Sequence, residues 1–170
     1  MKVLLTETQI AEKVRSLGAQ ISEDYRDLNP ILIALLKGSV VFLADLMRTI
    51  TIPHTIDFIR ASSYGAGMTS SGQVRVTSLE VDIQDRHVLL VEDIIDTGLT
   101  LQYISEVLLE RKPASLRVCT LLDKPASRRT PAKADYCGFT IPDTFVVGYG
   151  LDWDEQYRHL PHIAVVEQQE

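Results

Sequence analysis

Two short apolar runs constrain the fold of this chain most strongly, ILIALL at residues 31–36 and HVLLV at residues 87–91. Runs of this length without polar alternation are typical of strands buried on both faces, which occur in parallel sheets covered by helices. Lys37 and Gly38 follow the first run, and Glu92 and Asp93 follow the second. The chain is therefore expected to contain a buried parallel sheet with polar groups where its strands end.

Segments with helical spacing alternate with these runs. A helix is predicted from about Thr6 to Tyr25, because Thr6 and Gln9 form a capping-box pattern at its start. Its apolar residues recur every three or four positions and form one inward stripe: Ile10, Val14, Leu17 and Ile21. Further helices are expected over residues 42–47 and 101–108. Each would follow one of the apolar strands.

The remaining strands complete an α/β pattern. They are expected in HTIDFIRASSY after Pro53 and at residues 74–77, 116–122, 145–148 and 163–166. Because strands and helices alternate, the sequence predicts a doubly wound, mostly parallel sheet with helices on both faces. Ligands of such sheets bind at the carboxyl ends of the strands.

The composition indicates a single domain, residues 1–170, with 45% apolar and 24% charged residues. A net charge of −6 argues against a general nucleic-acid or membrane-surface protein. Cys119 and Cys137 are too few for a disulfide framework, and no run approaches the roughly 20 apolar residues of a membrane span. We therefore expect a cytoplasmic protein with no membrane and no nucleic-acid partner.

The second apolar run leads into a concentration of ligand-binding residue types. Glu92 and Asp93 offer carboxylates that bind vicinal hydroxyls or Mg²⁺. Asp96–Thr100 offers hydroxyls, a glycine and successive backbone N–H groups at a helix start, which suit a phosphate. The alternative is a simple helix cap beside a solvated acidic pair. The chain lacks the GxxxxGK[ST] and GxGxxG patterns, so any phosphate site is of another kind.

The stretch VLLVEDIIDTGLTL, residues 88–101, resembles the signature of the type I phosphoribosyltransferase family. Four further segments resemble successive parts of its hypoxanthine (guanine) members: LLKGS at 35–39, SSYG at 62–65, LLDKPASRR at 121–129 and FVVGYGLDWDEQYRHLPHIAVV at 145–166. The resemblance implies a type I phosphoribosyltransferase-like fold with a small base-binding hood. It also implies Mg²⁺-dependent transfer of a phosphoribosyl group to a 6-oxopurine, with IMP or GMP as product.

The resemblance assigns the donor site first. Glu92 and Asp93 would engage the ribose hydroxyls and their Mg²⁺. Asp96 would accept the purine proton as the catalytic base, and it belongs to the loop that would hold the 5-phosphate: Asp96, Thr97, Gly98, Leu99 and Thr100. A positioned base gains rate because a purine that loses a proton becomes a better nucleophile.

Pyrophosphate would be bound by two other segments. By resemblance, the backbone of Lys37 and Gly38 holds it, often across a cis peptide bond between Leu36 and Lys37. Arg158 would bind it with a forked guanidinium, and Asp152 would ligate a second Mg²⁺. Taken alone, Lys37 and Gly38 are an ordinary turn and DWDE is an exposed acidic turn.

Four residues are expected at the purine. Lys124 would donate to the 6-oxo oxygen, which disfavours adenine because its amino group is also a donor. Phe145 would stack on the ring, unless it is a core aromatic, and Val146 and Asp152 would present backbone carbonyls to N1 and the 2-position. A loop near residues 62–73, with Ser63 and Tyr64, would close over the site as a lid, the alternative being a disordered hairpin tip.

Two other functions are compatible with the pattern: a transferase for xanthine or a pyrimidine, and a nucleotide-sensing regulator that binds RNA. Clustered basic residues would favour the regulator, but the basic cluster at Arg128, Arg129 and Lys133 is short and is more typical of a solvated loop than of ligands. His159 and His162 form an HxxH pattern without a third ligand nearby, which argues against zinc. The family commonly forms homodimers or homotetramers, so a homo-oligomer is expected.

Overall fold

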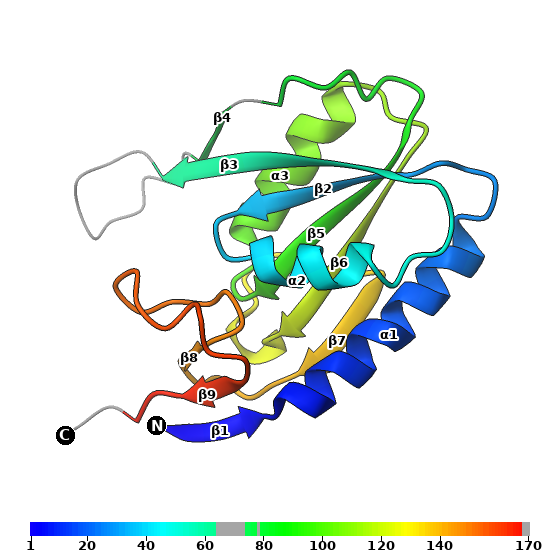
Figure 1. Ribbon diagram of the computed structural model, residues 1–170. Helices are drawn as coiled ribbons and strands as arrows, with labels where there is room; N and C mark the ends of the chain where they lie inside the picture. The colour runs from blue at the N-terminus through cyan, green and yellow to red at the C-terminus, as the bar shows by residue number, and fades with distance from the viewer. Residues whose placement is uncertain (64–73, 78, 168–170) are drawn as a thin grey trace.

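The computed structural model describes residues 1–63, 74–77 and 79–167. Its centre is a six-stranded sheet, which is drawn in Figure 1. The strand order is β4-β3-β2-β5-β6-β7. All neighbouring strands are parallel except β4, which pairs antiparallel with β3. The strands are β2 (Ile31–Leu36), β3 (Thr55–Ser63), β4 (Val74–Thr77), β5 (His87–Ile95), β6 (Ser115–Asp123) and β7 (Tyr136–Thr140). The predicted mostly parallel sheet is confirmed.

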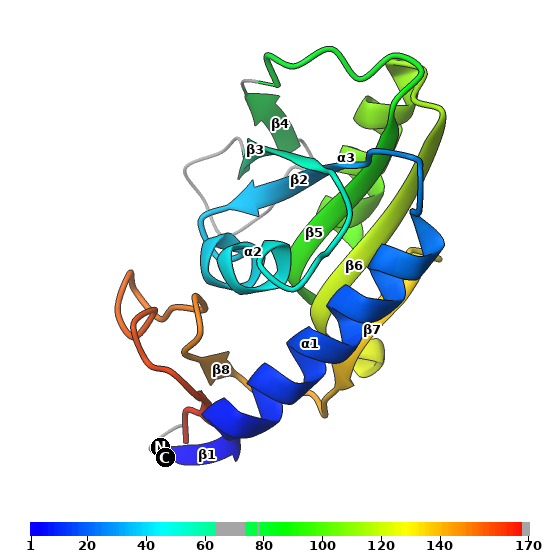
Figure 2. The same cartoon turned by 45° about the vertical axis from the view of Figure 1, so that its right-hand side comes forward.

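Helices cover both faces of this sheet, as the alternating pattern predicted. The helices α1 (Glu7–Asp24) and α2 (Val40–Met47) pack on one face, and α3 (Leu99–Glu110) packs on the other (Figures 1 and 2). The capping box is present at Thr6 and Gln9, so α1 begins where the sequence indicated. No helix within the described part of the chain is long and apolar enough to cross a membrane.

A second, smaller sheet forms the hood. It has the order β1-β9-β8, built from β1 (Lys2–Leu5), β8 (Val146–Val147) and β9 (Ile163–Val165). Both pairings are antiparallel, so the N-terminal strand lies beside the last strand of the chain (Figure 1). The sequence did not predict β1 or β7, because both are short and lie at sheet edges.

The strand order places a crevice at one point of the sheet. From β2 the chain proceeds to β3 and β4 on one side, whereas β5 leads to β6 and β7 on the other. Parallel α/β sheets bind ligands where the strand order reverses, outside the carboxyl ends of the two strands concerned. Those ends, after Leu36 and at Ile95, carry the segments that the sequence singled out.

Candidate active site

The loop Asp96–Thr100 joins β5 to α3 and borders a cavity of about 200 Å³. Gly98 has a φ of 84°, and a Cβ there would lie 2.5 Å from Thr130 Oγ1. The neighbouring segment supports the loop, because the Arg129 N–H donates to the Thr97 oxygen at 2.8 Å. The N-cap of α3 is Gly98, without a side-chain hydrogen bond, so Asp96 does not cap this helix. The simple-cap alternative is therefore wrong for Asp96.

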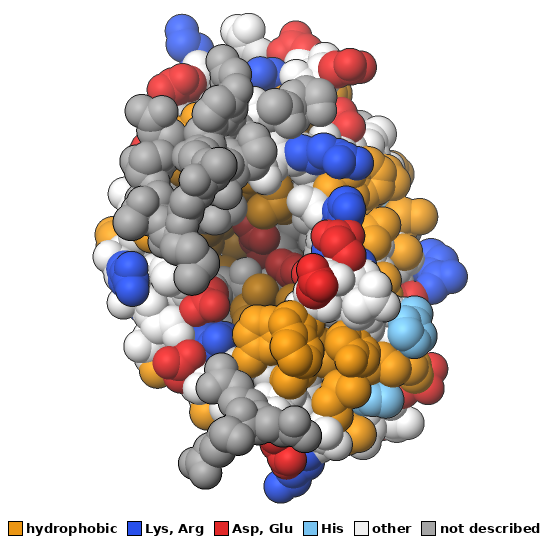
Figure 3. All heavy atoms as spheres, turned by 90° about the vertical axis from the view of Figure 1, so that its left-hand side faces the viewer, with side chains coloured by type: hydrophobic (Ala, Val, Ile, Leu, Met, Phe, Trp, Pro, Cys, Tyr) orange, Lys and Arg blue, Asp and Glu red, His pale blue; other side chains and the backbone are white. Residues whose placement is uncertain are grey.

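Glu92 and Asp93 lie within β5 rather than after it, and both line the same cavity. Figure 3 shows acidic side chains inside a hollow of the surface. Glu92 is buried, with 3% of its surface exposed, and Asp93 is half-buried. Burial raises the pKa of Glu92 well above its usual range, and the Asp93 carboxylate raises it further. Burial also raises the pKa of Asp93 to about 6, although the Ile94 N–H and Arg158 oppose that shift.

These two carboxylates fit a hard cation. Neither has an ion-pair partner among the residues that the structure describes. Their oxygens are the ligands that Mg²⁺ prefers, usually one or two from the protein with the rest from water and substrate. No three His, Cys, Asp or Glu residues of the described ranges group closely enough to hold an ion alone.

The raised pKa of Asp93 predicts a stability change. Its folded pKa of about 6 lies above the usual 3.8, so the folded protein binds more protons and its stability falls as pH rises between these values. Without divalent cations, Asp93→Asn is expected to stabilise the protein at pH 8 by up to about 3 kcal/mol, with little effect below pH 4. Thermal denaturation at both pH values measures this. The exposed control Asp27→Asn should show no such difference, and a destabilised Asp93→Asn at pH 8 would contradict the prediction.

Gly38 joins the end of β2 to the acidic pair. A Cβ at this position would lie 1.8 Å from Asp93 Oδ2, and a Cβ at Gly150 would lie 2.3 Å from the Gly38 carbonyl oxygen. Gly150 also has a φ of 96°, so glycine is required at this position both by the backbone conformation and by the lack of space for a Cβ. The Leu36–Lys37 peptide bond is cis, as the resemblance implied. The hood thus contacts the turn after β2, which contacts Asp93.

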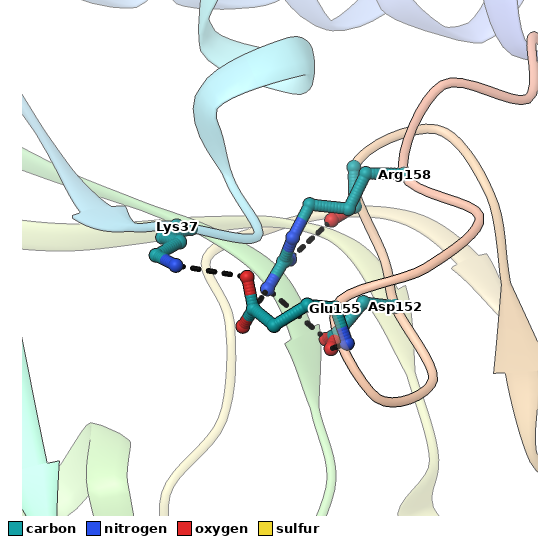
Figure 4. A network of polar contacts seen from close by, with 5 residues as sticks. Lys37, Asp152, Glu155 and Arg158 are labelled. Atoms are coloured by element: carbon teal, nitrogen blue, oxygen red, sulfur yellow. Dashed lines mark hydrogen bonds and ion pairs between the residues drawn. The ribbon is translucent and has the colours of Figure 1, made fainter.

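Arg158 organises the hood loop beside this turn (Figure 4). Its guanidinium donates to the Gly150 oxygen at 2.7 Å and pairs with Asp152 at 3.2 Å. Glu155 bridges two cations, with 3.1 Å to Arg158 and 2.8 Å to Lys37 Nζ. These ion pairs lower the pKa of Glu155. The structure therefore brings together three residues that the sequence predicted at pyrophosphate: Lys37, Asp152 and Arg158.

Lys124 follows β6 and reaches the catalytic candidate across the sheet end. Its Nζ lies 3.5 Å from Asp96 Oδ2 and 3.4 Å from Asp143 Oδ1. The Lys124 side chain is almost fully buried, and the Lys124 backbone N–H donates to the Ile95 carbonyl oxygen at 2.9 Å. The predicted base and the predicted purine donor are therefore neighbours.

Phe145 is 48% exposed, so it is not a core aromatic. It makes an edge contact with Trp153, with 6.5 Å between ring centroids. The Val166 N–H donates to the Phe145 oxygen and Val146 pairs with Val165. Because hydrogen-bonded pairs alternate in antiparallel ladders, the Val146 carbonyl points away from β9 to the outer edge of the hood sheet. An exposed ring and an outward carbonyl thus stand side by side.

Of the two residues predicted for the lid, the structure describes only Ser63. Ser63 ends β3, where its backbone pairs with Val74, and Tyr64 lies outside the described residues. Leu99 and Thr100 begin α3 and are exposed.

Sequence reasoning missed three residues of this region. Gly150 and Asp143 have the contacts given above. Arg128 was expected in a solvated loop, but its guanidinium pairs with Asp123 and bonds to Ala132, and its Nε donates to the Asp96 oxygen at 3.3 Å. Arg128 therefore supports the loop that carries Asp96, the candidate catalytic base. The contacts of Gly150 with Gly38, of Asp143 with Lys124 and of Arg128 with Asp96 each join segments that are far apart in the chain. Local sequence therefore gives little signal for them.

Comparison with known proteins agrees with this geometry. Residues 2–154 match the family model of the phosphoribosyl transferase domain. The chain therefore belongs to the phosphoribosyltransferase family.

Its relatives within that family carry more specific names. The chain is 47% identical over 167 residues to hypoxanthine-guanine phosphoribosyltransferase of Bacillus subtilis, covering 98% of this chain and 93% of the relative. It is 46% identical over 169 residues to hypoxanthine phosphoribosyltransferase of Escherichia coli, covering 98% and 95%. A hypoxanthine-guanine phosphoribosyltransferase structure from Bacillus anthracis has a TM-score of 0.93 at 48% identity, covering 98% of this chain and 99% of the other.

Proposed function

We propose that this protein transfers the 5-phosphoribosyl group of 5-phosphoribosyl 1-diphosphate to N9 of hypoxanthine, and of guanine, in purine salvage. The products are IMP or GMP and pyrophosphate, with inversion at the anomeric carbon. The observation that carries the proposal is the juxtaposition at the strand ends: the acidic pair and phosphate loop of β5 lie beside Lys124 and opposite the turn of Gly38. The named relatives support the choice of purine.

The donor is proposed to lie across the ends of β5 and β2. Asp96–Thr100 binds the 5-phosphate with N–H groups at the start of α3, where the helix dipole favours an anion. Glu92 and Asp93 accept hydrogen bonds from the ribose hydroxyls. Mg²⁺ held there and at Asp152 would neutralise donor charge. The backbone of Lys37 and Gly38, together with Arg158, receives the leaving pyrophosphate.

The base is proposed to lie between the hood and Lys124. Phe145 stacks on the ring, the Val146 and Asp152 carbonyls face N1 and the 2-position, and Lys124 donates to the 6-oxo oxygen. Asp96 accepts the proton from N7 as N9 attacks. The developing positive charge of the ribose is oxocarbenium-like, as in glycosyl transfer generally. Glu92 and Asp93 lie where they would stabilise the positive charge of the ribose electrostatically.

An assay of the purified protein tests the proposal. The protein is incubated with Mg²⁺, the phosphoribosyl donor and one of five bases: hypoxanthine, guanine, xanthine, adenine or uracil. We expect nucleotide and pyrophosphate from hypoxanthine and guanine but not from adenine or uracil. Binding of the donor without product from any base would instead favour a nucleotide-sensing regulator, and salt-dependent RNA binding would then be measured.

Removal of the Lys124 amine is expected to change base use. Lys124→Ala should lower kcat/KM for hypoxanthine by about 10- to 100-fold, because a charge-assisted hydrogen bond to oxygen 6 is lost. Adenine, which offers no oxygen there, should not be affected in the same way. Steady-state kinetics with both bases measures the ratio. An unchanged purine preference would mean that Lys124 does not contact the 6-position.

We further propose a cytoplasmic homodimer or homotetramer in which residues 1–170 act as one domain. Both cysteines are free thiols, which fits a reducing compartment. Val40 on α2 is 41% exposed next to the Gly38 turn, and we assign this helix to the contact between subunits. Light scattering coupled to size-exclusion chromatography gives the number of subunits.

A further inference from the structure

Asp143 is an acidic residue of the site that the sequence did not single out. It lies between β7 and β8, and its Oδ1 is 3.4 Å from Lys124 Nζ. Asp96 Oδ2 is 3.5 Å from the same nitrogen, so one ammonium serves two carboxylates from different strand ends. The lysine side chain is 8% exposed, whereas those of Asp96 and Asp143 are 50% and 65% exposed. The lysine side chain is therefore enclosed by the fold, whereas the two carboxylates approach its ammonium from the solvent side.

The position of Asp143 is itself supported. Ser127 Oγ donates to Asp143 Oδ1 at 2.9 Å. Ser127 ends the short 3-10 helix Pro125–Ser127, which begins directly after Lys124. The Ile141 N–H donates to the Asp123 oxygen at 2.9 Å, which ties the segment before Asp143 to the end of β6. Lysine and aspartate are thus anchored to the same two neighbouring strands.

The geometry has a consequence for Lys124. An ammonium carries three N–H donors on a flexible stem. The ammonium donates one of them to Asp96 at 3.5 Å and forms an ion pair with Asp143 at 3.4 Å, so an N–H is left for an acceptor of a ligand. If Asp143 were absent, the stem would let the ammonium approach Asp96 more closely. The lysine would then be drawn from the base pocket, and the negative charge of Asp96 would be neutralised more fully.

We propose that Asp143 is a positioning residue for 6-oxopurine recognition, which holds the Lys124 ammonium away from Asp96 and leaves an N–H directed to oxygen 6 of the base. This inference rests on the proposed function. Asp143 does not touch the reacting atoms, and it acts through Lys124 alone. Its effect should therefore appear with the purine and not with the phosphoribosyl donor.

The test compares Asp143→Asn, Asp143→Glu and the exposed control Asp27→Asn. We expect Asp143→Asn to raise KM for hypoxanthine about tenfold, while KM for the phosphoribosyl donor changes less than about twofold. Asp143→Glu keeps the charge and should restore much of the hypoxanthine affinity, and Asp27→Asn should match the wild type. Ser127→Ala should act in the same direction as Asp143→Asn, but less strongly.

A binding measurement provides a readout independent of turnover. Trp153 is the sole tryptophan of the sequence and lies against Phe145, so its fluorescence should report IMP binding. Weaker IMP binding by Asp143→Asn, with donor binding retained, supports the proposal. If the wild type makes IMP and Asp143→Asn binds hypoxanthine and IMP as tightly as the wild type does, the proposal is overturned. An equal loss of affinity for hypoxanthine and for the phosphoribosyl donor would also overturn it. A wild type that makes no IMP would instead contradict the proposed function.

Discussion

Asp96→Asn is expected to lower kcat by about 10²- to 10⁴-fold while leaving KM for the phosphoribosyl donor nearly unchanged. Asparagine has the shape of aspartate and keeps an oxygen that accepts from Lys124, but it has no useful basicity. The backbone of residue 96 is held independently, because Arg128 Nε donates to its oxygen at 3.3 Å. The loop that binds the 5-phosphate should therefore retain its conformation in the variant.

Pre-steady-state and steady-state kinetics with hypoxanthine measure this effect, and equilibrium binding of the donor provides the control. Asp143→Asn is a useful matched variant, because it makes the same chemical change on the other side of the same ammonium. It should affect KM for the purine more than kcat. Wild-type turnover in Asp96→Asn would remove Asp96 from the role of base, and a comparable loss of donor binding would indicate a loop that has moved.

Much of the central fold could be predicted because its signals are local. Continuous apolar runs identify β2 and β5, and the capping box at Thr6 identifies the start of α1. The parallel arrangement then follows from alternation, whereas the strand order, and with it the switch point, comes from the structure. The short edge strands β1 and β7 lack such signals, since neither contains a long apolar run, and β1 also depends on β9 at the other end of the chain.

The candidate site shows the same division. Residues of the phosphate loop are contiguous, so a single stretch of sequence indicates them. Asp143 approaches Lys124 from the loop between β7 and β8, and nothing near it in sequence indicates that contact. The conformation of the hood loop is even harder to predict from the sequence. Four of its residues have positive φ values although none is a glycine: Tyr149, Asp154, Glu155 and Tyr157. Such backbone is set by the surrounding contacts rather than by residue preference.

Gly38→Ala is expected to reduce kcat/KM for the phosphoribosyl donor by about 100-fold or more. The new Cβ would lie 1.8 Å from Asp93 Oδ2, so either the carboxylate or the turn must move. Asp93 cannot rotate freely, because its Oδ1 accepts the Ile94 N–H at 2.8 Å. On its other side the turn is confined by Gly150, which packs against the Gly38 oxygen. The proposed ribose and pyrophosphate contacts would both be displaced.

Gly18→Ala is the matched control, since a Cβ there would also meet a side-chain oxygen at 1.8 Å, that of Thr49. Thr49 lies just beyond the end of α2, whereas Gly38 precedes its start. Gly18→Ala should therefore lower Tm with little change in donor KM, and Gly38→Ala should raise donor KM whatever its Tm. Equal donor kinetics in the two variants would show that the close approach of Gly38 to Asp93 has no part in donor binding. A selective loss in Gly38→Ala would assign the turn after β2 and the acidic pair of β5 to one binding surface.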